Sequence, residues 1–284
     1  MFKLDMDAQA KINLTLDVLY RRPDGYHEVE MIMQSIALKD RLTIELMPRG
    51  FVKVCCNTPE LSCDESNLVY KAAKLMIDEY NLDAGVKVTL EKNIPLAAGL
   101  AGGSADAAAV IIGMNELFDL KIPTEKLMML GKTIGADVPF CIHGGTALAQ
   151  GIGEKITPLR PVKGMGLLLI KPPYAVSTKQ VYSRLDVKNI KTRPDTPAMV
   201  QKILSEDMGA VAKGLCNVLE EVTFELYPEL ARIKQELLEK GAMGSLMSGS
   251  GPTVYGVFET LSDAKKAAGK MPRGNRTFIV TETK

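Results

Sequence analysis

Hydrophobic and polar residues alternate with a period of two along much of the N-terminal half, which is typical of strands. Residues 10–20 are the clearest case. One face of this segment carries Ile12, Leu14, Leu16 and Val18, and the other carries Lys11, Asn13, Thr15 and Asp17. The polar face either meets solvent or faces a cleft. Further strands are predicted over residues 29–33, 41–46, 51–56, 86–90 and 144–151.

Helices are predicted where apolar residues recur every three or four positions. The first covers residues 67–77, with Ser66 or Asn67 as its N-cap. A second helix is rich in alanine and runs to about Phe118. A third begins at Pro123, a residue that is common in the first turn of helices.

The C-terminal half has a distinct order of elements. A cluster of prolines and glycine over residues 158–164 is the best candidate for a boundary, which predicts domains at 1–160 and 161–284. Beyond it we predict strands and helices over residues 165–170, 228–240, 244–248, 253–258, 262–270 and 277–281, with further helical segments before residue 228. This β-α-β-β-α-β order predicts a ferredoxin-like unit, and the whole chain is assigned to the α+β class.

The stretch 95–109 has the composition of an anion-binding loop. It passes through Gly99, Gly102, Gly103 and Ser104 and leads into the alanine-rich helix. Backbone N–H groups at the positive end of a helix dipole bind phosphate, and a serine adds a hydroxyl for phosphate or its magnesium. The alternative is a tight strand-to-helix turn that uses small residues for packing. The spacing Gly-x-x-Gly-Gly-Ser is neither a Walker A loop nor a dinucleotide fingerprint.

Composition excludes several classes of function. A net charge of +1 does not provide the basic surface that nucleic-acid binding requires. No apolar run is long enough to span a bilayer, and the first residues lack the apolar region of a signal peptide. The five cysteines include no Cys-x-x-Cys pair, which favours reduced thiols in a cytoplasmic protein. With two histidines in the chain, a histidine-rich metal site is nearly excluded.

Other candidate residues lie at turns. The turn 22–25 delivers Tyr26 and His27 to the start of a strand, although surface residues are common in such places. Asp137 lies between a helix-ending glycine and a proline, where a turn cap is the alternative to a chemical role. The glycine-rich turn 248–252 leads into a strand, so it is either a tight hairpin or a functional loop.

Three stretches, residues 11–13, 95–105 and 247–253, together resemble the three motifs of the GHMP small-molecule kinases. The resemblance covers essentially the whole chain, in the right order. Two further blocks, residues 22–27 and 135–140, are similar to those of the family members that phosphorylate a diphosphocytidyl alcohol for isoprenoid synthesis by the non-mevalonate route. The loop departs from many members in having Gly-Gly-Ser for Gly-Ser-Ser, which leaves one hydroxyl rather than two for magnesium.

The resemblance implies an N-terminal domain with the ribosomal S5 second-domain fold and a ferredoxin-like C-terminal domain. It also implies ATP with Mg²⁺ as cofactor and makes Lys11 and Asp137 the catalytic residues, with Asp137 as the base. The implied ATP-binding residues are Asn67, Pro95, Leu96, Ala97, Ala98, Gly99, Leu100, Ala101, Gly102, Gly103, Ser104 and Ala105. The implied substrate-binding residues are Asn13, Tyr26, His27 and Tyr182. Mg²⁺ would be held through the ATP phosphates, with Ser104 as a candidate ligand.

The expected partner is therefore a small cytidine-diphosphate substrate, without nucleic acid or membrane, and the chain is expected to be a monomer or a homodimer. Two alternatives remain open. One is a sister GHMP kinase with an acceptor of the mevalonate or homoserine type. The other is a non-catalytic binding protein with the same fold.

Overall fold

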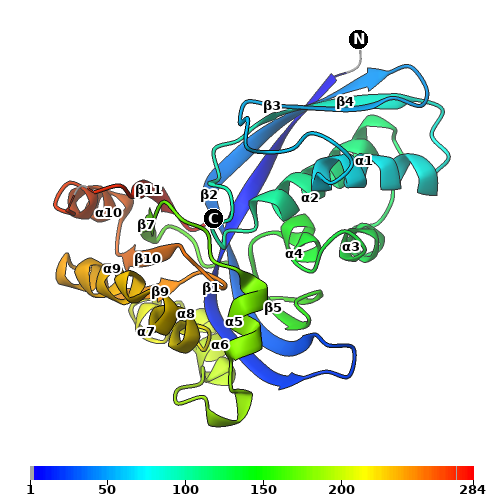
Figure 1. Cartoon of the computed structure of the whole chain (residues 1–284). Helices are drawn as coiled ribbons and strands as arrows, with labels where there is room; N and C mark the ends of the chain where they lie inside the picture. The colour runs from blue at the N-terminus through cyan, green and yellow to red at the C-terminus, as the bar shows by residue number, and fades with distance from the viewer. Residues whose placement is uncertain (1–2, 273) are drawn as a thin grey trace. The chain divides into compact units, whose positions relative to one another are not determined.

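The computed structural model describes residues 3–272 and 274–284, and the chain divides into two compact units (Figure 1). The first unit comprises the described part of residues 1–10 together with 38–95 and 101–144. The second comprises 11–37, 96–100 and the described part of 145–284. The sequence boundary at residue 160 stays a prediction.

Two long strands, β1 (Lys3–Arg21) and β2 (His27–Met47), are hydrogen-bonded neighbours that contribute to both units. The prediction of separate strands at 29–33 and 41–46 was wrong, because β2 continues through both. Gln34 interrupts the apolar pattern, yet its side chain is buried and donates to two backbone carbonyl oxygens at 2.8 and 3.0 Å. A buried polar group with its hydrogen bonds made lets the strand continue.

The first unit packs helices against the outer strands of this sheet. β3 (Val52–Cys56) is parallel to β4 (Gly85–Glu91), and β4 is antiparallel to β2. The helices are α1 (Leu68–Glu79), α2 (Gly102–Leu117), α3 (Thr124–Lys132) and α4 (Val138–His143). Figure 1 shows α1 and α2 side by side, and one apolar core joins them to β2, β3 and β4. The predicted helices are confirmed. Helix α4 was missed because six residues are too few to show a helical period.

The second unit contains the remaining strands of the first sheet. β5 (Thr146–Gly151) is antiparallel to β2, and β6 (Lys155–Pro158) is antiparallel to β5. The two-residue strand β8 (Cys216–Asn217) is parallel to β1. Sequence analysis missed β6 and β8, since two to four residues carry little periodicity.

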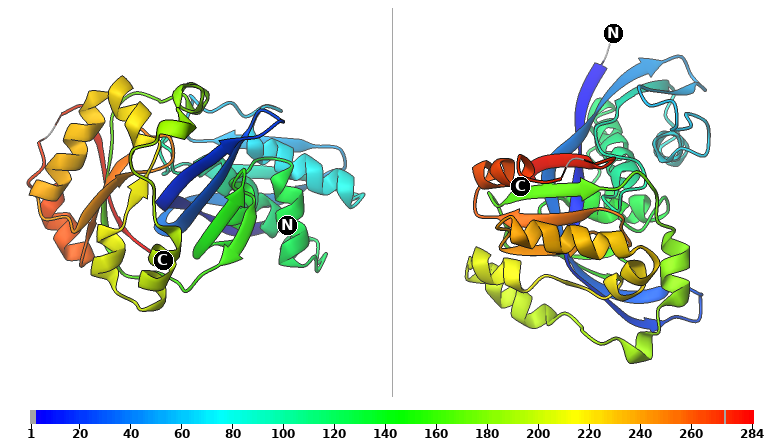
Figure 2. Two further views of the ribbon diagram at one scale, coloured as in Figure 1. Left: turned by 90° about the horizontal axis from the view of Figure 1, so that it is seen from below. Right: turned by 60° about the vertical axis from the view of Figure 1, so that its left-hand side comes forward.

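A separate four-stranded antiparallel sheet completes this unit. Its order is β11-β7-β10-β9, with bounds β7 (Gly166–Lys171), β9 (Gly244–Met247), β10 (Val254–Phe258) and β11 (Thr277–Glu282). Helices α9 (Pro228–Glu239) and α10 (Leu261–Ala268) cover one of its faces (Figure 2). This arrangement confirms the predicted ferredoxin-like unit.

An insertion separates β7 from α9. It contains α5 (Thr178–Arg184), the 3₁₀ turn η1 (Val187–Asn189), α6 (Thr196–Leu204), α7 (Met208–Lys213), β8 and α8 (Glu220–Leu226). Among the described residues of the chain, no helix is both long and apolar enough to cross a membrane.

Candidate active site

The glycine-rich stretch ends, in the first unit, at the N-terminus of α2. The residue before the helix, Ala101, has a left-handed φ of 56° and no polar side-chain atom with which to cap it. Gly102, Gly103 and Ser104 form the first turn, whose N–H groups lack intrahelical acceptors. Together with the helix dipole, these N–H groups fit an anion such as phosphate.

A buried ion cluster lies beneath this turn. The Lys92 ammonium contacts the carboxylates of Asp40 and Asp106, with 2.7 Å to Asp106 Oδ2, and all three side chains are at most 4% exposed. Asp40 Oδ1 also accepts the backbone N–H groups of Asn93 and Ile94 at 2.5 and 2.8 Å. The cluster therefore fixes the chain on both sides of the glycine stretch. Sequence analysis missed it, because its members become neighbours only through the fold.

Asp106 differs from Asp40 in its surroundings. Among the described residues, nothing donates a hydrogen bond to Asp106 Oδ1. Burial, opposed by Lys92 and reinforced by Asp40, raises the pKa of Asp106 from 3.8 to about 8. The carboxyl group therefore keeps its proton in the folded protein at pH values where the unfolded chain has lost it.

This raised pKa predicts a pH-dependent stability. The contribution of the protonated Asp106 is fully present below pH 4 and is lost as the pH rises towards 8. In wild type, the free energy of unfolding should fall between pH 5 and pH 8. In Asp106→Asn, which has no carboxyl group to ionise, we expect this fall to be smaller by at least about 1 kcal/mol. Urea titrations of both proteins at the two pH values provide the measurement. Parallel pH profiles would show that Asp106 is ionised in the folded state.

Asp137 lies at the N-cap of the short helix α4, in the same unit. Among the described N–H groups of α4, none donates a capping bond to its carboxylate, so the capping alternative is not supported. The preceding turn lies beside α2, since a Cβ placed on Gly135 would be 3.8 Å from Ser104 Oγ. The fold thus brings the turn that precedes Asp137 to the first turn of α2.

In the second unit, the polar face of β1 is buried rather than solvated. Lys11 is 4% exposed and Asn13 is fully buried. The Lys11 Nζ donates to Asn13 Oδ1 at 2.9 Å, and the Asn13 Nδ2 lies 3.2 Å from the sulfur of Met31 on β2. The Lys11 backbone N–H donates to the carbonyl oxygen of Leu100, at the end of the glycine-loop segment of this unit. The solvated alternative for this strand face was wrong.

The turn between β9 and β10 meets both of these segments, and β9 and β10 pair as the predicted hairpin. Its Gly249 N–H donates to Asn13 Oδ1 at 3.0 Å, and its Ser248 hydroxyl donates to the Gly99 carbonyl at 2.9 Å. Gly99 has a φ of +75°, and a Cβ there would lie 2.3 Å from the Ser248 carbonyl oxygen. Glycine is therefore required at position 99. All three sequence motifs therefore have residues that meet in the second unit. These residues are 11–13, the loop residues up to 100, and the turn 248–252.

The predicted pyrimidine-binding residues also lie in the second unit. His27 and Tyr182 are far apart in sequence, yet their ring centroids are 5.1 Å apart at 42°. Tyr26 is 61% exposed, so most of its ring is accessible. Two hydrogen bonds define the turn before it: Asp24 Oδ1 accepts the Tyr26 N–H, and the Arg22 side chain donates to Asp24 Oδ2. Burial, aided by Arg21, lowers the pKa of His27, which favours the neutral imidazole.

Asn67 is confirmed as the N-cap of α1. Its Oδ1 accepts the Val69 N–H at 2.9 Å, and its Nδ2 donates to the Ser62 carbonyl at 2.6 Å. The side chain is nearly buried. Its contact with adenine stays a prediction.

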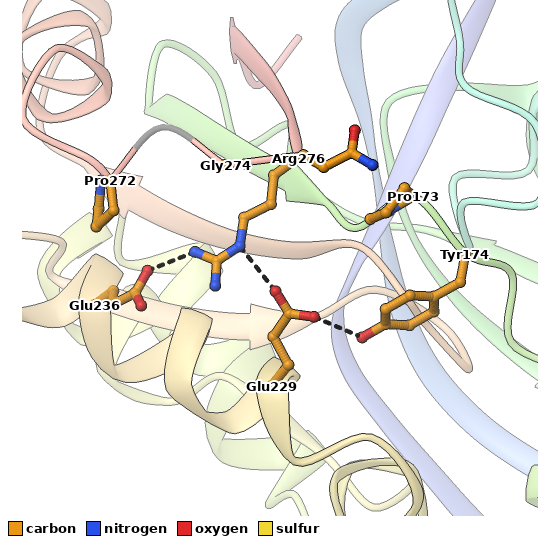
Figure 3. Close-up of a pocket in the computed structure, with 8 residues that line it drawn as sticks. Pro173, Tyr174, Glu229, Glu236, Pro272, Gly274 and Arg276 are labelled. Carbon is orange, nitrogen blue, oxygen red and sulfur yellow. Dashed lines mark hydrogen bonds and ion pairs between the residues drawn. The ribbon is translucent and has the colours of Figure 1, made fainter.

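A cavity of about 440 Å³ lies elsewhere in the second unit, against α9 (Figure 3). Figure 3 shows Arg276 between Glu229 and Glu236, with the Tyr174 hydroxyl directed at Glu229. The Arg276 Nε lies 2.9 Å from Glu229 Oε1, and its Nη1 lies 2.8 Å from Glu236 Oε2. These polar groups pair with one another, and the lining includes none of the predicted site residues. Among the described residues there is also no cluster of three histidine, cysteine or acidic side chains suited to a metal ion.

Comparisons with known proteins match the chain to one family. A family model described as the GHMP kinases N terminal domain matches residues 67–145, and one described as GHMP kinases C terminal matches residues 199–276. A 4-diphosphocytidyl-2-C-methyl-D-erythritol kinase of Acetivibrio thermocellus is 50% identical over 283 residues and is matched over 100% of both chains. Its counterpart from Clostridium botulinum (strain Eklund 17B) is 46% identical over 99% of this chain and 100% of that one.

Solved structures are similar as well. A crystal structure of 4-(cytidine 5'-diphospho)-2C-methyl-D-erythritol kinase matches with a TM-score of 0.83 at 32% identity, over 99% of this chain and 100% of that one. Homoserine kinase from Cytophaga hutchinsonii gives a TM-score of 0.76 at 19% identity, over 99% and 95% of the two chains. The L. major mevalonate kinase gives 0.77 at 17%, over 99% and 97%. At these lower identities the likeness shows the fold alone.

Proposed function

This chain belongs to the GHMP kinases, and from that premise we propose that it transfers the γ-phosphoryl group of ATP to the 2-hydroxyl of 4-diphosphocytidyl-2-C-methyl-D-erythritol. The observation that carries the proposal is the full-length match to kinases of that substrate, at up to 50% identity, together with the buried cation and amide at Lys11 and Asn13. The reaction would serve the non-mevalonate route to isoprenoid precursors.

The phosphate donor fits the N-terminus of α2. The uncapped first turn would offer backbone N–H groups to the phosphates of ATP. By resemblance to the family, Pro95 to Ala105 would bind the phosphates and Asn67 the adenine. Mg²⁺ is commonly held by nucleotide phosphates plus one or two protein oxygens, and the Ser104 hydroxyl in the first turn of α2 is the candidate protein oxygen. Bound there, Mg²⁺ would neutralise phosphate charge.

The catalytic step needs little from the protein besides positioning and charge. In the proposed mechanism the acceptor oxygen forms a bond to the γ-phosphorus, the bond from that phosphorus to the bridging oxygen breaks, and ADP leaves. Asp137 accepts the proton of the hydroxyl. Lys11, whose ammonium is held by Asn13, stabilises the negative charge on the transferring group. Asn13 binds the acceptor near its reacting end.

The cytosine is assigned to the aromatic group of the second unit. Tyr26 has an accessible ring for stacking, Tyr182 lies beside His27, and His27 reads the polar edge of the pyrimidine. A neutral imidazole, favoured by the lowered pKa, can both donate and accept a hydrogen bond. We place the enzyme in the cytoplasm, because five cysteines without a Cys-x-x-Cys pair suit a reducing compartment. We expect it to be a monomer or a homodimer.

An ADP-release assay tests the proposal. Turnover should require the diphosphocytidyl substrate together with ATP and Mg²⁺, and phosphorus NMR of the product should show a new phosphomonoester. Mevalonate and homoserine are the comparison substrates. Turnover of either of them in place of the cytidine compound would favour the sister-kinase alternative, and ATP binding without any turnover would favour a binding protein.

The stacking role predicts a specific pair of variants. Tyr26→Ala should raise KM for the diphosphocytidyl substrate about tenfold or more, because stacking of a base on an aromatic ring contributes about 1–3 kcal/mol. Tyr26→Phe keeps the ring and should be nearly silent. KM for ATP should stay constant in both, as measured by initial rates with each substrate varied. An unchanged KM in Tyr26→Ala would mean that the base is bound elsewhere.

A further inference from the structure

Asn217 lies beneath the glycine turn 248–252, although no motif in the sequence singles it out. Its side chain is 3% exposed. The Nδ2 group donates to the carbonyl oxygens of Met247 and Gly249, each at 2.8 Å, and Oδ1 accepts the Leu219 N–H at 3.0 Å. The two acceptor carbonyls bracket the peptide between Ser248 and Gly249. Both amide hydrogens of Asn217 are therefore used to hold the turn on its two sides.

The strand that carries Asn217 is fixed to the strand of the candidate catalytic lysine. β8 pairs in parallel with β1, with Asn217 opposite Leu16, and the Val218 N–H donates to the Leu16 carbonyl at 3.0 Å. This short strand belongs to the insertion between β7 and α9 and lies outside every motif that carries the resemblance to the family. The insertion thus supplies an anchor between β1 and the glycine turn.

A chain of hydrogen bonds leads from this anchor to the candidate catalytic residue. The bracketed peptide carries the Gly249 N–H, which donates to Asn13 Oδ1 at 3.0 Å. The same oxygen accepts from the Lys11 ammonium at 2.9 Å. Rotation of the peptide would remove one of the two donors that orient Asn13, and Asn13 in turn orients Lys11.

We propose that Asn217 is a positioning residue for phosphoryl transfer, which acts by holding the Gly249 N–H against Asn13 and thereby fixes the Lys11 ammonium. This inference rests on the proposed function. It predicts a loss in turnover rather than in nucleotide binding, because the helix N-terminus that fits the phosphates is made by other residues. A misplacement of about 1 Å in a positioned group can cost about a hundredfold in rate.

The chain offers a matched control in Asn115. Its Nδ2 donates to the Ile122 carbonyl and its Oδ1 accepts the Ile122 N–H, so it ties a loop in the same manner. Asn217→Asp and Asn115→Asp each remove the amide donors while keeping the oxygen and the size of the side chain. Both variants should lose stability, and only Asn217→Asp should lose kcat.

The test measures kcat and both KM values with the diphosphocytidyl substrate, well below the melting temperature of each variant. We expect Asn217→Asp to lower kcat about tenfold or more, with KM for ATP within about threefold of wild type, while Asn115→Asp stays within twofold in kcat. In an Asn13→Ala background, Asn217→Asp should have little further effect on kcat, because Asn217 acts on Lys11 through Asn13.

Several outcomes would overturn the inference. Equal kcat values for the two Asn→Asp variants would show that Asn217 is only structural, and so would additive effects in the Asn13→Ala background. If Asn217→Asp does not fold, Asn217→Ser, which keeps one donor and adds no charge, is judged by the same criteria. Absence of turnover in wild type and Asn115→Asp would instead overturn the proposed function, and this inference with it.

Discussion

Replacing Asp137 by asparagine is expected to lower kcat by at least about a hundredfold, the low end of what a positioned general base contributes. The asparagine amide cannot take the proton of the substrate hydroxyl at neutral pH, yet it has the size and shape of the carboxyl group. Because asparagine is isosteric with aspartate, the fold should be little affected. Steady-state kinetics with saturating ATP and diphosphocytidyl substrate provide the measurement, with circular dichroism to check the fold.

Asp207→Asn is the matched control for this variant. Asp207 also lies at a helix N-cap, that of α7, and its carboxylate accepts the Ala210 N–H. Asparagine is as good a cap as aspartate, so kcat should be unchanged there. A kcat for Asp137→Asn within a few-fold of wild type would remove Asp137 from the role of base and leave the transfer to depend on charge stabilisation alone.

Lys92→Met is expected to lower the free energy of unfolding by about 3 kcal/mol, because removal of one partner of a buried ion pair typically costs about 3–5 kcal/mol. Methionine fills the space of the lysine stem, so the effect reports charge rather than a cavity. We expect the low end of the range for two reasons. Asp40 keeps its two backbone N–H donors, and the raised pKa lets Asp106 hold a proton. Urea denaturation at pH 7 gives the value.

Lys87→Met provides the comparison, on strand β4, which ends one residue before Lys92. Lys87 pairs with Glu45 at 2.9 Å, but their side chains are 34% and 21% exposed. An ion pair of this kind contributes about 0–1 kcal/mol, so the loss should be small. If both variants lost the same stability, the buried cluster at Lys92 would contribute no more than an exposed ion pair. Packing would then have to hold the glycine loop in place.

Most of the fold could be predicted from the periodicity of apolar residues, because the longer strands and helices show a clear period of two or of about 3.6. The exceptions have physical causes. Gln34 broke the pattern of β2 although it is buried, since its hydrogen bonds are made within the fold. The strand β8 is too short to show a pattern, and it pairs with a strand some 200 positions earlier. No local signal records such a pairing.

The candidate site was predictable where a motif is contiguous. The sequence singled out Gly99, Gly102 and Gly103 as a group, but it did not predict the different structural role of each one. Gly99 has the left-handed backbone and the close approach that require glycine, whereas Gly102 is helical and a Cβ there would meet Ile94 and Lys92. The supporting residues Asn217 and Lys92 were invisible for another reason. Each works through partners that only the folded chain brings near.

The route of the chain through its two units limits how the protein can be divided. The polypeptide passes from one unit to the other after residues 10, 37, 95, 100 and 144, and two of these passages lie inside the unbroken strands β1 and β2. A single proteolytic cut or gene split therefore leaves at least one fragment with an incomplete unit. Neither unit can be exchanged by recombination as one continuous segment. Evolution of a new acceptor specificity in such a chain must proceed by substitutions and loop changes rather than by domain shuffling.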